Sequence, residues 1–198
     1  MSRVHAVILA GGAGERLGGV RKADLRIGGR RLADRVAAAL GDVAAPILFS
    51  TGPKPRPAPA GMMAVPDLPA PLGGPLAGLA AAVAELQRRG IGDGLLVSVA
   101  VDTPFLPADF VTVMQDGLGE APAAYASWGE AFYPPNAVWR IAALPEQVLA
   151  GRAPGSLKAL HRALGSRAVD WTEGQAADPF ANLNTLADLM ALGRRARL

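Results

Sequence analysis

The sequence predicts an α/β protein, with a mostly parallel sheet covered by helices on both faces and one antiparallel strand. Two observations carry this prediction. Short apolar segments alternate with segments of helical spacing through residues 1–118, and such alternation is typical of parallel strands joined by helical crossovers. Residues 95–101, LLVSVAV, are continuously apolar, as a strand buried on both faces must be. A length of 198 residues suits one domain, residues 1–198.

The strands are predicted where short runs rich in Val, Ile, Leu or Phe are bounded by Gly, Pro or Asp. Glycines follow the run at 4–10, and Asp102 follows the run at 95–101. Pro46 begins the run at 46–50, and Pro66 follows the run at 62–65. A Gly28-Gly29 turn accompanies a short early strand. We expect the second strand after residue 118 to run antiparallel. The predicted strands are 4–10, 25–27, 46–50, 62–65, 95–101, 123–127, 132–139 and 168–171.

The helices are predicted from apolar residues at intervals of three and four. Leu32, Val36 and Leu40 share one face of the first helix. Pro75 suits the first position of the second helix, where its missing N–H costs nothing. The predicted helices are 32–40, 75–89, 107–118, 141–150, 156–164 and 185–192. The Pro-rich segment 52–61 is expected to be an extended surface loop, because proline removes hydrogen-bond donors and fixes φ.

Composition excludes several classes of protein. With 51% hydrophobic and 19% charged residues, the chain is not disordered as a whole. It has no cysteine and only two histidines, His5 and His161. Disulfides, thiolate metal sites and cysteine nucleophiles are therefore excluded. We see no targeting signal and no apolar run of about 20 residues, so we expect a cytoplasmic protein with no membrane partner.

The positive charge is concentrated in one segment. Residues 15–35 contain seven Lys and Arg against three Asp and Glu, a net +4, which exceeds the +3 of the whole chain. A pI near 9.8 is too mild to indicate nucleic acid, and none is expected as a partner. The local positive field favours a phosphate-bearing ligand beside the glycine-rich loop.

That loop, AGGAGERLGGVRK at residues 10–22, is the strongest motif. Glycines let backbone N–H groups approach phosphate oxygens, and Arg16 and Lys22 add positive charge for a triphosphate. The loop lacks the Gly-Lys-Ser/Thr of a P-loop, and Leu17 replaces the third glycine of a dinucleotide fingerprint. The alternative is a flexible turn with a solvated basic end.

Other candidate residues follow other predicted strands. Asp102 ends the strand at 95–101 and offers a hard oxygen ligand suited to Mg²⁺; its alternative role is a helix N-cap. Asp67 follows the strand at 62–65, with a turn residue as the alternative. Asn182 and Asn184 flank Leu183 and either contact a ligand or cap the last helix. Ligands of parallel sheets bind at the carboxyl ends of the strands, where these segments converge.

Four segments together resemble the molybdenum cofactor guanylyltransferases, the MobA family. They are LAGGAGERLGGVRK after the first strand, PLGGPLAGL at a helix start, VAVDTPFLP after the central strand and FANLNTLADL near the end. The resemblance covers about residues 4–192 and is weak over 110–175. It implies a Rossmann-like α/β/α sandwich. It also implies transfer of GMP from GTP to the terminal phosphate of molybdopterin, with Mg²⁺ and release of pyrophosphate.

The resemblance also implies roles for individual residues. Leu9, Ala10, Gly11 and Gly12 match the segment that binds the guanine nucleotide, and Lys22 matches a phosphate-binding lysine. Asp67 matches an acidic nucleotide-binding position. Asp102 matches the magnesium ligand. Asn182 and Asn184 match an asparagine pair near the pterin side of the cleft.

The interpretation leaves alternatives. Gly12 favours guanine, since relatives that use cytidine nucleotides tend to have LAAG in this segment, and Arg21 stands where an acidic residue is usual. Arg16, Lys22 and Asp102 are the predicted catalytic residues of an in-line displacement. A related nucleotidyltransferase using CTP or a sugar phosphate, and a nucleotide-binding protein without turnover, are the competing hypotheses. We expect a monomer, with GTP and molybdopterin as ligands and molybdopterin-delivering proteins as partners.

Overall fold

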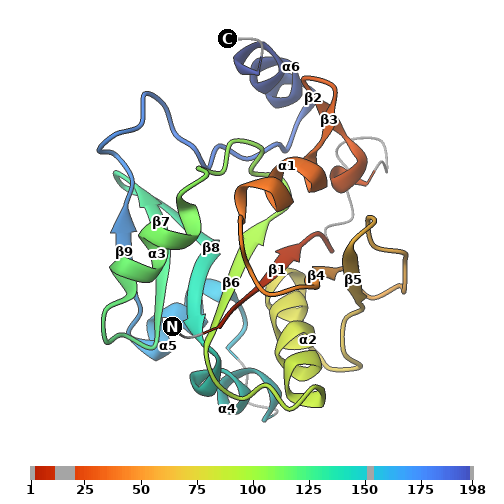
Figure 1. The fold of residues 1–198 in the computed structure, drawn as a ribbon, viewed down its shortest axis with the longest axis vertical. Helices are drawn as coiled ribbons and strands as arrows, with labels where there is room; N and C mark the ends of the chain where they lie inside the picture. The colour runs from red at the N-terminus through yellow and green to blue at the C-terminus, as the bar shows by residue number, and fades with distance from the viewer. Residues whose placement is uncertain (1–2, 12–20, 151–153, 197–198) are drawn as a thin grey trace.

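The computed structural model describes residues 3–11, 21–150 and 154–196. Over these residues its main sheet has seven strands in the order β5-β4-β1-β6-β8-β7-β9, which run through the centre of the molecule (Figure 1). The strands of this sheet are β1 Val4–Leu9, β4 Ile47–Ser50, β5 Met62–Val65, β6 Leu95–Ala100, β7 Ala123–Trp128, β8 Ala131–Arg140 and β9 Arg167–Asp170. A small two-stranded sheet consists of β2 Arg26–Ile27 and β3 Arg30–Arg31.

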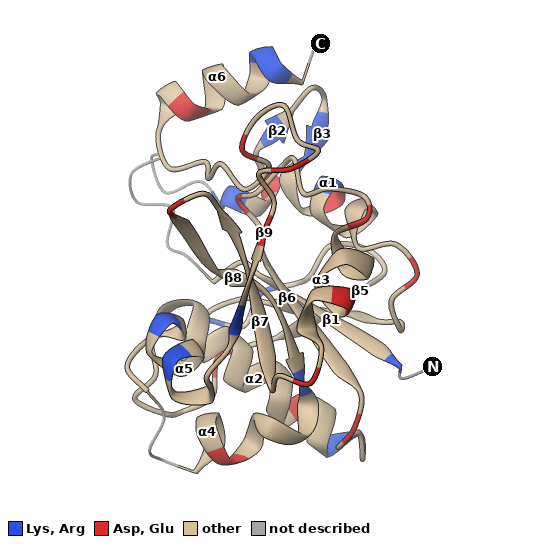
Figure 2. Cartoon of the chain, turned by 90° about the vertical axis from the view of Figure 1, so that its left-hand side faces the viewer, with Lys and Arg blue, Asp and Glu red and all other residues tan. Residues whose placement is uncertain are grey.

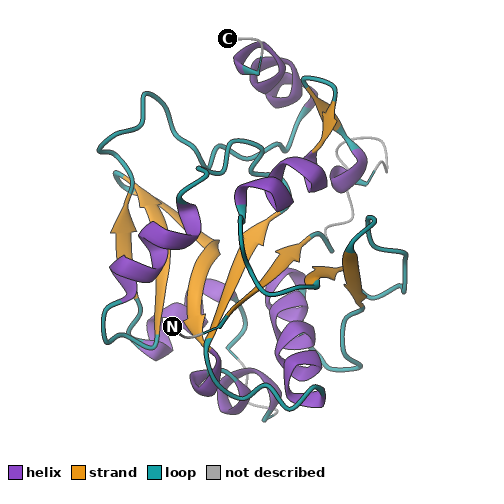
Figure 3. Cartoon of the chain, in the orientation of Figure 1, coloured by secondary structure: helices purple, strands orange, loops and turns teal. Residues whose placement is uncertain are grey.

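The helices connect these strands and add a C-terminal segment (Figure 3). They are α1 Leu32–Ala39, α2 Gly74–Arg88, α3 Phe110–Leu118, α4 Pro145–Leu149, α5 Leu157–Leu164 and α6 Leu186–Arg195, with 3₁₀ turns η2 Lys22–Asp24 and η3 Ile141–Ala143. In the described part of the chain, no helix is both long and apolar enough to cross a bilayer.

Strand pairing confirms the predicted sheet. β1 pairs in parallel with β4 and β6, and β4 pairs in parallel with β5. β8 is antiparallel to both of its neighbours, β6 and β7, while β9 is parallel to β7. β1, β4 and β6 therefore bring their carboxyl ends to one edge of the sheet, where the predicted site residues were expected to meet.

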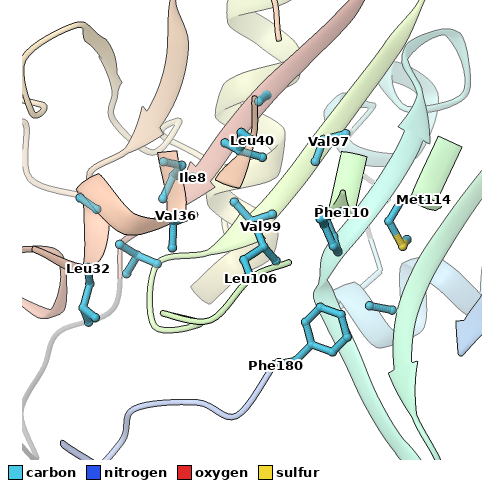
Figure 4. Close-up of a cluster of buried hydrophobic side chains, with 14 of the residues drawn as sticks. Ile8, Leu32, Val36, Leu40, Val97, Val99, Leu106, Phe110, Met114 and Phe180 are labelled. Atoms are coloured by element: carbon cyan, nitrogen blue, oxygen red, sulfur yellow. The ribbon is translucent and has the colours of Figure 1, made fainter. Parts of the chain in front are cut away.

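The sheet separates two hydrophobic cores, as the predicted three layers require. On one face, Ile8, Val97 and Val99 pack with side chains of α1 and α3 (Figure 4). On the other face, α2, α4 and α5 cover the sheet through a second cluster that includes Leu79 and Trp139. The edge-on view in Figure 2 separates α4 and α5 from α3 and α1 across the strands. The three-layer α/β/α prediction is confirmed.

Local differences from the prediction have local causes. The helix predicted over residues 141–150 is divided into η3 and α4, because Pro145 has no N–H to continue a helix and instead begins a new one. α3 begins at Phe110 rather than at residue 107, with Asp109 as its N-cap. Gly28 and Gly29 have φ of 56° and 78°, which explains why two glycines form the β2–β3 turn.

Candidate functional site

A pocket of about 240 Å³ lies at the carboxyl ends of β1, β4 and β6. We call it the strand-end pocket. The fold forms it because each of these parallel strands gives way to a loop at the same edge, and the N-terminus of α2 lies beside them. Its lining residues are Leu9, Ala10, Gly11, Lys22, Ser50, Gly74, Pro75, Ala100, Val101, Asp102, Pro135 and Asn182.

Two opposite charges meet in this pocket. Lys22 begins η2, and Asp102 comes two residues after β6 ends at Ala100. The Lys22 Nζ donates to Asp102 Oδ2 at 2.7 Å, with 18% and 17% of the two side chains exposed. This contact joins the end of the glycine-rich loop to the end of the central strand across 80 positions of the chain. It is the juxtaposition that the strand-end argument predicts.

The C-terminal segment completes this cluster. The Leu183 N–H donates to the Asp102 carbonyl oxygen at 3.1 Å, and the Leu183 side chain is fully buried. On either side of this anchor, Asn182 lines the pocket and Asn184 Oδ1 accepts from Lys22 Nζ at 2.8 Å. The segment after β9 is therefore fixed against both charged residues of the site.

Close backbone packing shapes the pocket floor. A Cβ placed on Gly11 would lie 3.0 Å from the Gly52 Cα, and one on Gly78 would lie 2.9 Å from the Ser50 Cβ. Side chains at these two positions would push apart the turns after β1 and β4, or lift α2 from the sheet. Glycine is needed at Gly11 because the backbone of the turn after β4 comes too close for a side chain, and at Gly78 because the Ser50 side chain does.

Two buried polar atoms lie beside this floor. Asp67 donates its N–H to the Gly52 carbonyl oxygen at 3.0 Å, which places it next to the Gly11–Gly52 contact. Its Oδ1 and the Thr51 Oγ1 are buried and have no hydrogen-bond partner in the described part of the protein. Burial raises the pKa of the Asp67 carboxyl. Unsatisfied buried acceptors are costly in a native protein, so these two atoms indicate a ligand that supplies donors.

The N-terminus of α2 provides a complementary feature. Gly73, its N-cap, has no side chain that could bond the first N–H groups, and the first turn has no acidic residue. Gly74 and Pro75 line the strand-end pocket. A helix N-terminus of this kind directs N–H groups and a partial positive charge towards an anion.

The donor set fits a metal ion that is shared with phosphate groups. Across residues 3–11, 21–150 and 154–196, no three His, Cys, Asp or Glu side chains cluster as a metal cage. Among the described residues, Asp102 alone places a carboxylate in the strand-end pocket. Mg²⁺ is commonly held by one or two carboxylates, with water and substrate phosphates as its other ligands, so a single aspartate beside a phosphate site suits it.

The structure thus brings most of the predicted site residues together. Gly12 and Arg16 lie outside the described residues, and Asp67 adjoins the pocket without lining it. The N-cap alternative for Asp102 is wrong, since Asp109 occupies the N-cap position of α3, and Thr185 rather than either asparagine caps α6. The roles themselves stay predictions.

Sequence reasoning missed several pocket residues. Ser50 ends β4 and lines the pocket, and the buried Thr51 follows it beside the pocket; the strand-end rule applied to that strand could have found both. Pro135 lies inside β8, and no local pattern marks it. The buried His161 also has partners that no local pattern marks: its ring nitrogens contact the Ser166 Oγ and the Pro134 carbonyl oxygen, each at 3.0 Å.

A second and larger hollow of about 470 Å³ lies under the β7–β8 hairpin, against α5 and β9. We call it the hairpin cavity. Tyr125 and Phe132 form part of its wall with ring centroids 4.2 Å apart, and Lys158, Arg162 and Glu130 add charge. It shares no lining residue with the strand-end pocket and contains none of the predicted site residues.

Comparison with known proteins decides the family. The model of the MobA-like NTP transferase domain matches residues 6–169. The chain belongs to this family. The match extends over β1, β4, β5 and β6 and so contains the strand-end pocket apart from its C-terminal edge at Asn182. Nucleotidyltransferases of this kind generally use a divalent metal ion.

Members of the MobA-like family resemble the chain over nearly its whole length. The molybdenum cofactor guanylyltransferase of Acidiphilium cryptum is 41% identical over 193 residues, 96% of this chain and 94% of the relative. That of Rhodobacter capsulatus is 37% identical and covers 98% of this chain and 97% of its own.

Solved structures show the same fold. The molybdopterin-guanine dinucleotide biosynthesis protein A of Archaeoglobus fulgidus superposes with a TM-score of 0.70 at 18% identity, covering 98% of each chain. The 2-C-methyl-D-erythritol 4-phosphate cytidylyltransferase of Thermus thermophilus superposes with a TM-score of 0.64 at 24% identity, covering 99% of this chain and all of its own. This fold is the Rossmann-like nucleotidyltransferase fold that the sequence resemblance implies.

Proposed function

We propose that this enzyme is a molybdenum cofactor guanylyltransferase, which transfers GMP from GTP to the terminal phosphate of molybdopterin and releases pyrophosphate. The curated relatives of this name match the chain nearly end to end. The observation that carries the proposal is the 2.7 Å contact between Lys22 and Asp102 in the strand-end pocket. It supports the proposal because a cation and a carboxylate that could hold a metal ion meet in the pocket that Gly11 and the N-terminus of α2 also line.

The chemistry is an in-line displacement at the α-phosphorus of GTP. An oxygen of the acceptor phosphate forms the new bond to the α-phosphorus, and the bond from the α-phosphorus to the bridging oxygen of the β-phosphate breaks. The electron pair of that bond leaves with pyrophosphate. The attacking oxygen is already anionic at neutral pH, so the enzyme needs no strong base, and positioning and charge neutralisation carry the catalysis.

The pocket residues divide these tasks. Asp102 would hold Mg²⁺, which when bound neutralises and orients the reacting phosphates. Lys22 binds the phosphates and, together with Arg16, stabilises the departing pyrophosphate. To do so Lys22 exchanges its bond to Asp102 for a bond to phosphate oxygen. This exchange keeps both groups partly neutralised at every stage and avoids an isolated charge in a half-buried pocket.

The remaining predicted residues bind the two substrates. Leu9, Ala10, Gly11 and Gly12 approach the nucleotide through their backbone. The Asp67 Oδ1 and the Thr51 Oγ1 accept hydrogen bonds from the nucleoside, whose donors would satisfy these buried atoms. Asn182, which lines the strand-end pocket, and Asn184, which accepts from Lys22, face the acceptor. The protein acts as a monomer of one domain, and proteins that deliver molybdopterin are its partners.

The test is incubation of the purified protein with GTP, Mg²⁺ and molybdopterin, with detection of the guanine dinucleotide by mass and of pyrophosphate by a coupled assay. Parallel reactions replace GTP by CTP, or molybdopterin by a sugar phosphate. The proposal expects product only with GTP and molybdopterin. Product only with CTP or with the sugar phosphate would assign a related transferase. GTP binding without pyrophosphate under any condition would leave a nucleotide-binding protein.

A further inference from the structure

The C-terminal helix α6 is connected to the catalytic lysine by an unbroken series of hydrogen bonds. The series begins at the N-terminus of α6, where Thr185 and Asp188 form a capping box: the Thr185 Oγ1 accepts from the Asp188 N–H at 3.1 Å and the Asp188 Oδ2 accepts from the Thr185 N–H at 2.8 Å. Such a box normally satisfies two N–H groups within the helix terminus.

In this protein the same Asp188 oxygen makes one more bond. It also accepts from the N–H of Asn184 at 2.9 Å, one residue outside the box. The Asn184 side chain in turn accepts from Lys22 Nζ at 2.8 Å, and Lys22 donates to Asp102 at 2.7 Å. The pKa of the Asp188 carboxyl lies below its usual range, first because the Asn184 N–H donates to it, then because Thr185 does, and in smaller part because Lys22 is near.

The rest of α6 packs lightly against the protein. Leu192 is the buried residue of the helix, while Leu186 and Met190 are 65% and 59% exposed. At the other end, Arg195 donates to the Asp178 carbonyl oxygen at 2.7 Å and lies 4.3 Å from the centre of the Phe105 ring. The C-terminal end of α6 is thus anchored to the loop that follows Asp102, and the capping box orders the N-terminal end.

We propose that Asp188 is a positioning residue for Lys22, acting through the Asn184 backbone. Its carboxylate fixes the turn before α6, so that the Asn184 amide oxygen meets Lys22 and holds the ammonium group at the mouth of the strand-end pocket. The long lysine side chain has many rotamers, and a fixed second acceptor limits them before the triphosphate binds. This inference rests on the proposed function and adds a residue that does not touch the substrates.

The test compares binding of GTP·Mg²⁺ by Asp188→Ala, Asn184→Ala and the double variant. We expect each single variant to raise the Kd about threefold to fivefold, the size of effect that loss of one cap produces. The double variant should be no worse than Asn184→Ala alone, because Asp188 acts only through Asn184. Asp188→Asn keeps an acceptor oxygen in place, and Asn caps helices about as well as Asp, so its Kd should stay within about twofold of that of the unmodified protein.

The matched control is Ser156→Ala. Ser156 is the N-cap of α5 and accepts from the Ala159 N–H at 3.2 Å, so its loss also removes one helix cap, far from Lys22 in the sequence. Asp188→Ala and Ser156→Ala should both lower Tm, but only Asp188→Ala should weaken binding.

Equal Kd values for these two variants, or additive losses in the double variant, would overturn the positioning role. Failure of the unmodified protein to bind GTP·Mg²⁺ would instead overturn the proposed function.

Discussion

The strand-end pocket and the hairpin cavity differ in how their charged groups are arranged as well as in volume. The hairpin cavity is larger, about 470 Å³ against about 240 Å³, and has aromatic walls and basic residues on α5, one of the basic regions visible in Figure 2. The strand-end pocket has Lys22 and Asp102 in direct contact, a free helix N-terminus and buried acceptors beside it. The comparison teaches that the proposed reaction centre is marked by convergent charge at the carboxyl ends of parallel strands, and not by the size of a hollow.

The variant Asp102→Asn should have the largest effect, and it tests the role of the strand-end pocket. The strand-end pocket would lose its carboxylate, and transfer should fall by about 10³-fold, since the interaction of a metal with a reacting phosphate contributes several kcal/mol. The measurement is kcat/KM for dinucleotide formation, with Tm as the control for folding. Activity close to that of the unmodified enzyme would contradict the role of Asp102.

A residue of the hairpin cavity should affect the free energy of unfolding rather than the binding of nucleotide. Burial lowers the pKa of His161 to about 4 from the usual 6.5, so the folded state keeps the ring neutral where the unfolded state takes up a proton. Between about pH 6.5 and pH 4 the unfolded state binds more protons, and the free energy of unfolding should fall by about 3 kcal/mol as the pH drops through this interval.

Denaturant titrations at several pH values would measure this decrease, and His161→Gln would serve as the control without a titrating ring. If both proteins lose the same stability from pH 6.5 to pH 4, His161 is not the group responsible.

One lysine from each site can be replaced to compare the two sites in GTP binding. Lys22→Ala should raise the Kd for GTP about 30-fold, the equivalent of one lost charge-assisted hydrogen bond of about 2 kcal/mol. Lys158→Ala removes the same charge from the hairpin cavity and should leave the Kd for GTP unchanged. Titration calorimetry with GTP·Mg²⁺ measures both, and a larger loss for Lys158→Ala would move the nucleotide to the hairpin cavity.

The smallest effect is expected at Asp67. Replacing it by Asn removes a half-buried charge whose Oδ1 has no partner in the described protein, so the free energy of unfolding should stay the same or rise. Binding of GTP should weaken about fivefold, by roughly 1 kcal/mol for one hydrogen bond. Chemical denaturation measures the free energy of unfolding, and calorimetry measures the Kd for GTP. A variant that is both less stable and fully able to bind GTP would exclude Asp67 from the nucleotide site.

The sequence predicted the strand-end pocket better than the hairpin cavity for a physical reason. Strands joined by helical crossovers usually run in parallel, so the sequence alone assigns Asp102 and the glycine-rich loop to one edge of the sheet. The contact between Lys22 and Asn184 joins residues 162 positions apart and depends on how α6 folds back. No local pattern encodes that path.

In the second half of the chain, too, contacts between distant residues could not be predicted from local patterns. Its strands and helices were found in roughly the right places, but the partners of His161 come from β8 and from the turn after α5. The hairpin cavity arises from how α5 lies over β7 and β8, which is a matter of tertiary packing. Pro145 and Asp109 changed helix boundaries by local rules that could be applied beforehand.

The most direct test of the account is a crystal structure of the protein with a non-hydrolysable GTP analogue and Mg²⁺. The account predicts that the triphosphate lies in the strand-end pocket, with a phosphate oxygen on the Lys22 Nζ and the Lys22–Asp102 distance opened beyond about 4 Å, the limit of an ion pair. A nucleotide seated in the hairpin cavity, or phosphates that leave the Lys22–Asp102 contact intact, would contradict it.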